Sequence, residues 1–190
     1  MVRIEAGDGD PDDIERIARE SDTVREFWEL TLEDARAMMA DRESDGYETL
    51  LLPSGDTTPK HPDSGDTDEW GLSYIVPGNK AEEFEAFSEG VTFSETAVYQ
   101  QSEGGNTFIV TECLDPEAEK SLFIAGAYRM RFAPPMVRTA LERDRMYSHV
   151  KKLDGTPLAT IEHDDPDAFF PDPEQFYAHE VDEMYGLDEE

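Results

Sequence analysis

Carboxylate side chains dominate the charge of this sequence: 46 Asp and Glu stand against 16 Lys and Arg, which leaves a formal net charge of −30 on 190 residues. At low ionic strength such a charge opposes compaction, because like charges on one small globule repel each other. In roughly 1 M salt the Debye length falls to about 3 Å and most of that repulsion disappears. The charge therefore leaves two outcomes, a disordered polyanion or a folded domain adapted to high salt.

The apolar residues favour the folded domain. Disordered chains are poor in aromatics, whereas this one has 10 Phe, 2 Trp and 7 Tyr, placed at helix and strand periods. Its pI of about 4.2 excludes a generally basic nucleic-acid binder. A single cysteine excludes an intrachain disulfide and a C-x-x-C zinc or redox site.

Three segments carry a resemblance to a known family: GYETLLLPSGD, GLSYIVPG and LDGTPLATIEHDDPDAFFP. They resemble an uncharacterised family of small acidic haloarchaeal proteins, and the composition resembles that of cytosolic proteins of salt-accumulating archaea. The resemblance implies no activity and no site residues. With no apolar segment of membrane-spanning length and no signal-peptide core, we expect a cytoplasmic protein without membrane contact.

Periodicity predicts an α+β fold. An N-terminal helix is expected over about residues 11–41, a crossover helix from Asn79 and a short helix after Pro134-Pro135, before a final hairpin. The expected strands cover 47–52, 70–76, 93–101, 107–114, 120–132, 145–153 and 157–163, and form one mainly antiparallel sheet of about seven strands.

The domain organisation follows from the same pattern. Residues 1–163 are expected to form a single domain with a mobile loop over 53–69, where Gly, Pro, Asp and Thr prevail. Residues 164–190 are an acidic tail with a helical apolar stripe from about Pro173 to Tyr185, expected to dock on the domain.

Two fragments of metal-binding patterns occur, and each is incomplete. Asp8, Asp10 and Asp12 match the start of a calcium loop, but the required Gly and Glu are missing further on. His179 begins an H-E-x-x-H pattern whose second histidine is replaced by Glu183. Helix capping and an exposed acidic helix face explain these residues better, so we expect no metal site and no cofactor.

Catalytic motifs are also missing: no nucleophile elbow, P-loop or dinucleotide fingerprint occurs in the sequence. Cys113 has no base or cation beside it along its strand, so an inert buried thiol is expected. His163 falls near the core face at a strand end, where a structural role is the better interpretation.

The most informative feature is a positive island. Between Arg129 and Lys152 lie seven basic residues and two acidic ones, in a chain that is otherwise strongly negative. The basic residues are Arg129, Arg131, Arg138, Arg143, Arg145, Lys151 and Lys152.

Strand alternation assigns part of this island to one surface. A turn at Asp154-Gly155 pairs His149 with Thr160 and points Met146, Ser148, Val150, Ala159 and Ile161 to the core. If the two strand groups face the same way, one sheet surface carries the candidate ligand-binding residues Arg129, Arg131, Arg145, Tyr147, His149 and Lys151. The plainer interpretation is that these cations pair with the surplus carboxylates, within the chain or at a dimer interface.

Three classes of function are compatible with these observations. The favoured one is a non-catalytic binding or homo-oligomeric assembly module, because no catalytic motif is present and antiparallel sheets often leave one face to a partner. The alternative is a small enzyme or anionic-ligand-binding protein, with His149 as acid or base between Arg131 and Lys151 and with Tyr147 orienting the ligand. Nucleic-acid contact is the least favoured, since high salt weakens binding to phosphates.

The charge generates the first prediction. Circular dichroism in molar KCl should show a folded protein whose structure weakens on dialysis into low salt, because the carboxylates then repel one another. Full stability without salt would contradict this.

Overall fold

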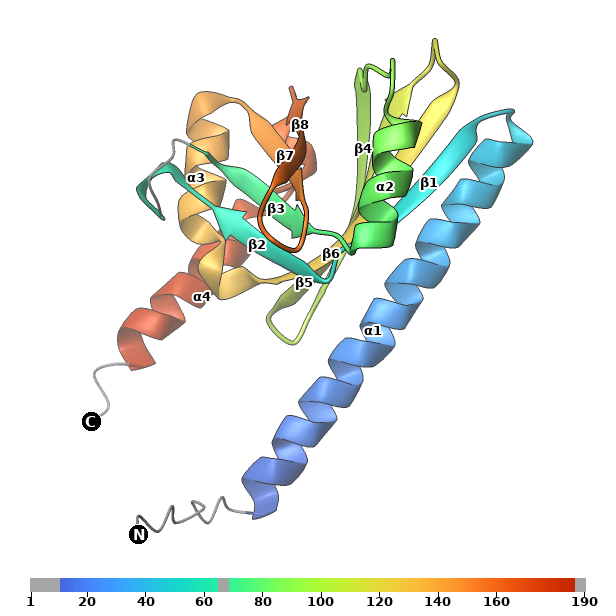
Figure 1. Ribbon diagram of the computed structural model, residues 1–190. Coiled ribbons are helices and arrows are strands. Elements are labelled where there is room, and N and C mark those ends of the chain that lie inside the picture. The colour runs from blue at the N-terminus through green and yellow to red at the C-terminus, as the bar shows by residue number, and fades with distance from the viewer. Residues whose placement is uncertain (1–10, 65–68, 187–190) are drawn as a thin grey trace, which may run out of the picture.

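A computed structural model describes residues 11–64 and 69–186 (Figure 1). The fold is α+β, with four α-helices and eight strands in these residues. The strands form two four-stranded mixed sheets. The expectation of a single, mainly antiparallel sheet of about seven strands is therefore wrong in its details, although the fold class is confirmed.

The first sheet has the order β1-β6-β5-β4. Its last three strands are the antiparallel meander expected from the turn residues, and β1 pairs with β6 in parallel. The strands are β1 (Glu48–Pro53), β4 (Glu95–Glu103), β5 (Asn106–Asp115) and β6 (Lys120–Arg129).

The second sheet has the order β2-β3-β7-β8. Here β3 and β7 are parallel, while β2-β3 and β7-β8 are antiparallel pairs. The strands are β2 (Asp56–Lys60), β3 (Gly71–Ile75), β7 (Met146–Lys151) and β8 (Pro157–His163).

Each expected helix is present. They are α1 (Pro11–Ser44), α2 (Gly78–Phe87), α3 (Pro134–Arg143) and α4 (Pro173–Gly186). Three 3-10 turns cover Pro62–Ser64, Met130–Phe132 and Pro166–Ala168.

Strand β2 lies in the segment that was expected to be a loop over 53–69. The composition of this segment hides the strand, because Asp56, Thr58 and Pro59 have no apolar alternation. The strand forms by pairing with β3, with Asp56 opposite Ile75 and Lys60 opposite Gly71. It is an edge strand of its sheet, and an edge position tolerates a proline.

The main core lies between the two sheets. Successive residues of β6 point to opposite faces of the sheet: Leu122 and Ile124 belong to the main core, and Phe123 and Ala125 belong to a second cluster on the opposite face. Helices α2 and α3 close the main core with Phe84, Phe87, Met136 and Val137. From the tail, Phe169, Phe170 and Phe176 are also buried in the main core.

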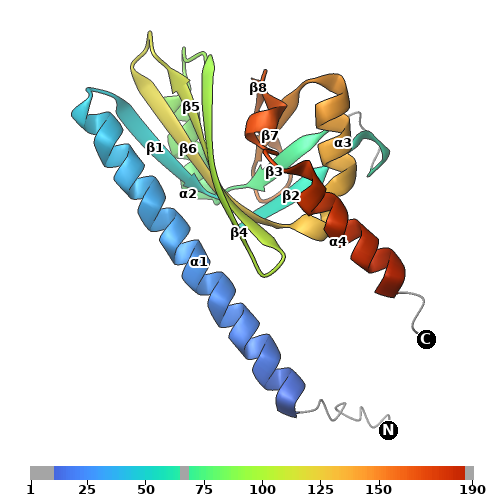
Figure 2. The same cartoon turned by 180° about the vertical axis from the view of Figure 1, so that it is seen from behind.

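The second cluster is small and is covered by α1. Ala35 is fully buried against Leu51, Val110, Phe123 and Ala125. The helix contacts β1, β5 and β6, and so covers the sheet face that points away from the main core (Figure 2).

A charged contact fixes the C-terminal end of α1 on this face. The guanidinium of Arg42 donates two hydrogen bonds to the carboxylate of Glu112, at 2.7 and 2.9 Å. The Glu112 side chain is only 2% exposed, and it also accepts a hydrogen bond from the Ser121 hydroxyl. The hydrogen bonds from Arg42 to Glu112 raise the pKa of the Arg42 guanidinium.

The N-terminal half of α1 extends away from both sheets (Figures 1 and 2). Contact with the sheet begins near Phe27, whose ring stacks on Phe108 at 5.7 Å between centroids. Before this point Ile14 and Ile17 are 59% and 57% exposed. None of the helices in the described residues is long and apolar enough to cross a lipid bilayer.

The Arg42–Glu112 pair generates the second prediction. Arg42→Met leaves a buried carboxylate without its partner, and should lower the free energy of unfolding by about 2–3 kcal/mol, since the arginine itself is partly exposed. Urea denaturation in molar KCl measures this change. Arg36→Met removes an exposed arginine from the same helix and is the matched control, for which little change is expected. Equal stability of the two variants would contradict the assigned role of the pair.

Candidate functional site

The structure separates the six candidate ligand-binding residues into two groups. Arg145 precedes β7, and Tyr147, His149 and Lys151 lie on it. Arg129 ends β6 in the other sheet, and Arg131 follows in a 3-10 turn. The single sheet surface expected to carry all six is therefore not formed, because β6 and β7 belong to different sheets.

The β7 group borders a surface hollow of about 240 Å³. Its lining residues come from β7, from β8 and from the segment that leads into β3. They are Glu69, Trp70, Tyr147, His149 and Thr160. This hollow is the candidate functional site.

The backbone of β3 lies close to β7 beside the hollow. Gly71 has a φ of +119°, and a Cβ atom built on it would lie 2.1 Å from the carbonyl oxygen of Tyr147. Only glycine fits this approach. The neighbouring Trp70 ring meets the Tyr147 ring edge to face, with centroids 4.9 Å apart, and its indole N–H donates to the carbonyl of Arg145.

Both ring nitrogens of His149 are occupied. Its Nε2 lies 2.9 Å from the carbonyl oxygen of Trp70, and its Nδ1 lies 3.1 Å from the Thr160 hydroxyl. A carbonyl can only accept, so Nε2 carries the proton and Nδ1 accepts from Thr160 in the neutral ring. The side chain is 8% exposed. Burial lowers the pKa of His149, against the opposing effects of the Trp70 carbonyl and of Glu69.

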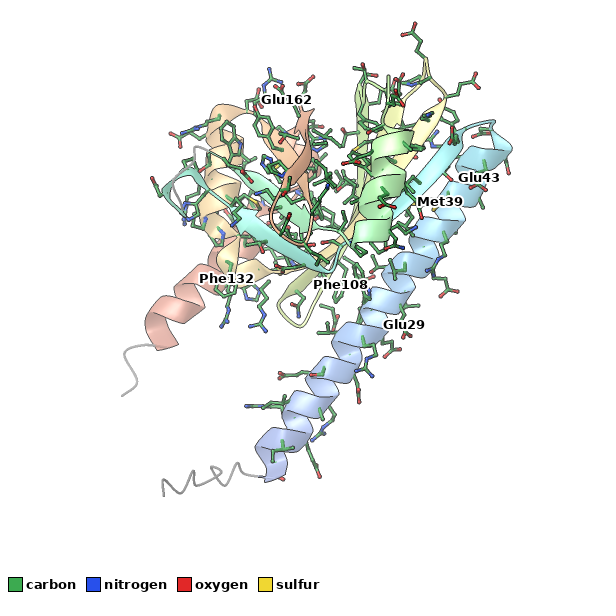
Figure 3. The ribbon with its side chains drawn as sticks, viewed as in Figure 1. Glu29, Met39, Glu43, Phe108, Phe132 and Glu162 are labelled. Carbon is green, nitrogen blue, oxygen red and sulfur yellow. The ribbon has the colours of Figure 1, made fainter. Side chains whose placement is uncertain are left out.

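The cations around the hollow have carboxylate partners. Lys151 donates to Glu69 at 2.9 Å. Arg145 pairs with two carboxylates: its Nε lies 3.2 Å from Oε1 of Glu162, and it also pairs with Asp164. Glu162 lies on β8 and is labelled in Figure 3. These contacts leave little net positive charge at the hollow.

Three other cations of the island contact aromatic rings, while Lys152 pairs with Glu85 at 3.7 Å. Arg143 lies 4.7 Å from the centroid of Trp70, at the rim of the hollow. Away from the hollow, Arg131 lies over the exposed ring of Phe132, which Figure 3 labels. Arg138 lies over the partly buried ring of Tyr177 on α4.

Two lining residues, Glu69 and Trp70, were not among the predicted site residues. Trp70 was expected only as the start of a strand, and Glu69 as the end of a loop. Their place beside His149 depends on the parallel pairing of β3 with β7, which joins residues more than 70 positions apart. No local pattern in the sequence carries that information.

The other candidate groups are buried. Cys113 is fully buried, and burial raises the pKa of its thiol to about 12, which suits an inert thiol. His163 links the two sheets: its Nδ1 lies 2.7 Å from the Thr96 hydroxyl on β4, and its Nε2 lies 2.9 Å from the Ser148 hydroxyl on β7.

The two incomplete metal-binding patterns are only partly covered by the structure. Asp8 and Asp10 lie outside the described residues, as does the side chain of Glu183. Among the described side chains, no three His, Cys, Asp or Glu come together in a way that could hold a metal ion.

A comparison with known protein families finds one that matches most of the chain. Residues 14–171 match the model of a family of unknown function, DUF7529. The chain belongs to this family. The expected membership of an uncharacterised family is confirmed to that extent. No curated protein and no solved structure matches the chain.

His163 generates the third prediction. Burial lowers its pKa to about 4, whereas an unfolded histidine titrates near about 6.5. Between these values the unfolded chain binds a proton that the folded protein does not bind. Stability should therefore fall as the pH decreases through this window, by about 1–2 kcal/mol between pH 7 and pH 5.

The measurement compares urea unfolding at these two pH values in wild type and in His163→Gln, whose amide can still bond both hydroxyls. His179→Gln, on helix α4, is the control. The His163 variant should lose part of the acid destabilisation that the control keeps. The same pH dependence in all three proteins would rule out this role of His163.

Proposed function

We propose that this protein is a non-catalytic binding module that works as a homo-oligomer. The observation that carries the proposal is the projecting half of α1, where Ile14 and Ile17 are more than half exposed on a helix that leaves the body of the protein. Most helical stability in proteins comes from the packing of an apolar face, which the projecting half lacks, so a partner that covers its apolar side would stabilise it.

The state of His149 supports a non-catalytic role for the hollow. A general base needs a free lone pair at the reacting atom, and a general acid needs a proton that it can release to a substrate. In His149 the Nδ1 lone pair accepts from Thr160 and the Nε2 proton is donated to Trp70. The ring therefore acts as a brace between β8 and the start of β3.

The alternative is a small enzyme or an anionic-ligand-binding protein that uses His149, Arg129 and Arg131. The hollow is the observation in its favour, because its Trp70 and Tyr147 rings could hold a small planar ligand. The separation of Arg129 and Arg131 from the hollow weakens it, as does the pairing of Lys151 with Glu69.

The net charge supports a location for this protein in a cytoplasm of high salt concentration. A protein of net charge −30 with paired surface cations suits the cytoplasm of a salt-accumulating cell, where high salt screens the carboxylates. Solvent cations would then be its main electrostatic partners.

Light scattering after size-exclusion chromatography in molar KCl tests the proposal. The molar mass should exceed the 21.5 kDa of one chain and should rise with protein concentration towards an integral multiple. A strict monomer at every concentration would contradict the proposed assembly.

A further inference from the structure

The aromatic wall of the hollow is held in place by hydrogen bonds. The indole N–H of Trp70 donates to the carbonyl oxygen of Arg145 at 3.0 Å, and the Trp70 carbonyl oxygen lies 2.9 Å from Nε2 of His149. The Tyr147 ring meets the indole edge to face, with centroids 4.9 Å apart. A ligand that enters the hollow finds both rings in position, so little free energy is lost in ordering them.

Arg143 is the cation of the hollow that has no carboxylate partner among the described residues. Lys151 pairs with Glu69, and Arg145 pairs with two carboxylates. The exposed Arg143 side chain instead lies over Trp70, with Cζ 4.7 Å from the ring centroid. In a chain whose acidic residues outnumber the basic ones by 46 to 16, this leaves one uncompensated positive charge at the rim of the hollow.

The last turn of α3 places this guanidinium at the rim. A cation is favourable at a helix C-terminus, and Arg143 ends α3 just before Asp144 takes the left-handed conformation, with φ of 56°. Neither Glu142 nor Asp144 forms an ion pair with Arg143 in the described part of the chain. The five N–H donors of a guanidinium lie in its plane, so one face can rest on the indole while two donors bind a carboxylate side by side.

The other groups at the hollow limit the size of a ligand and leave its charge to Arg143. His149 is neutral, since one of its ring nitrogens donates a hydrogen bond and the other accepts one. The Glu69 carboxylate accepts from Lys151 at 2.9 Å, so these two charges cancel. The volume of about 240 Å³ exceeds the roughly 150 Å³ that is enough to enclose benzene, which leaves room for one ring and a small substituent.

We propose that the hollow binds a small aromatic carboxylate. The ring of the ligand lies against Trp70 and Tyr147, and its carboxylate accepts two hydrogen bonds from Arg143. A single carboxylate matches this single cation, whereas a phosphate group carries up to about two charges and the next cation, Lys151, is already bonded to Glu69. The inference rests on the binding role in the proposed function, names the class of ligand, and does not depend on the homo-oligomer.

The expected affinity is modest. The hollow is open to solvent, and the ion pair with the ligand lies at an exposed rim, where molar salt screens the attraction. A ligand of about nine non-hydrogen atoms should then bind with a dissociation constant in the millimolar range.

Benzoate is the probe, and the indole N–H resonances of the protein report its binding. The sequence has 2 tryptophans, and Trp28 packs on the second cluster, on the face of the first sheet that points away from the main core. In an NMR titration in molar KCl, benzoate should shift the Trp70 resonance to saturation and leave the Trp28 resonance unchanged. Benzamide has nearly the same shape without the charge, and should bind about tenfold more weakly.

Three variants of the full chain test the role of Arg143. Arg143→Gln should weaken benzoate binding about tenfold, to the level of benzamide, because the guanidinium is lost. Arg143→Lys keeps the charge without the paired donors, and its affinity should lie between those of wild type and Arg143→Gln. Arg129→Gln removes an exposed arginine at the end of β6, outside the hollow, and is the matched control with wild-type affinity. An unchanged Trp28 resonance shows that each variant is folded.

The remaining outcomes separate this inference from the proposed assembly. No change at Trp70 with benzoate up to about 30 mM would overturn the inference and leave the proposed homo-oligomer standing. Equal binding of benzoate and benzamide, or full benzoate affinity in Arg143→Gln, would also overturn it, because Arg143 would not select the charge. The same shift with acetate, which has no ring, would mean an adventitious ion only and would overturn the aromatic ligand. Benzoate binding to a strictly monomeric protein would support the ligand and contradict the assembly.

Discussion

The buried ion pair between Arg42 and Glu112 decides where the longest helix of this protein lies. A carboxylate that is almost fully buried is costly unless it is paired and hydrogen-bonded, and Glu112 has both a bidentate guanidinium and the Ser121 hydroxyl. The pair fixes the C-terminal end of α1 on the outer face of the first sheet, where Ala35 fills the space between the helix and the strands. Helix α1 has 34 residues and is about 51 Å long, whereas the ten residues of β5 or of β6 extend over roughly 33 Å, so the N-terminal half of the helix leaves the body. The exposed isoleucines follow from this arrangement.

The second sheet explains why the positive island does not form one continuous sheet surface. Its cations are distributed over two sheets, a 3-10 turn and helix α3, and those at the hollow meet carboxylates or aromatic rings. The hollow itself is built around a neutral histidine whose two nitrogens hold β8 and the residues before β3 together. The surplus of carboxylates thus serves as a source of partners for the few arginines and lysines. Such pairing is what the plainer interpretation of the sequence expected, and binding of an anionic ligand by the island stays a prediction.

Local signals in the sequence predicted local structure well. The Asp154-Gly155 turn led to the hairpin, and His149 does lie opposite Thr160. Nearer the turn, the register shifts between Val150 and Lys151, so the regular pairing implied by a two-residue turn at Asp154-Gly155 does not continue to the end of the hairpin.

What the sequence could not predict depends on contacts between distant segments. The parallel pairs β1-β6 and β3-β7 divide the expected sheet into two. The strands of each pair are far apart in the sequence, so no tight turn between them predicts the pairing. For the same reason Arg129 and Arg131 were placed beside Tyr147, and Glu69 and Trp70 were missed. The helical stripe of α1 was visible in the sequence, but only the structure shows that its first half is left uncovered.

Hydrogen exchange along α1 tests the central claim most directly. In dilute protein, the backbone amides of the uncovered half around Ile14 and Ile17 should exchange faster than those around Ala35, which pack on the first sheet. The exchange of the uncovered half should slow as the protein concentration rises and copies associate. Equal protection along the whole helix in dilute protein, or no effect of concentration on the uncovered half, would contradict the account.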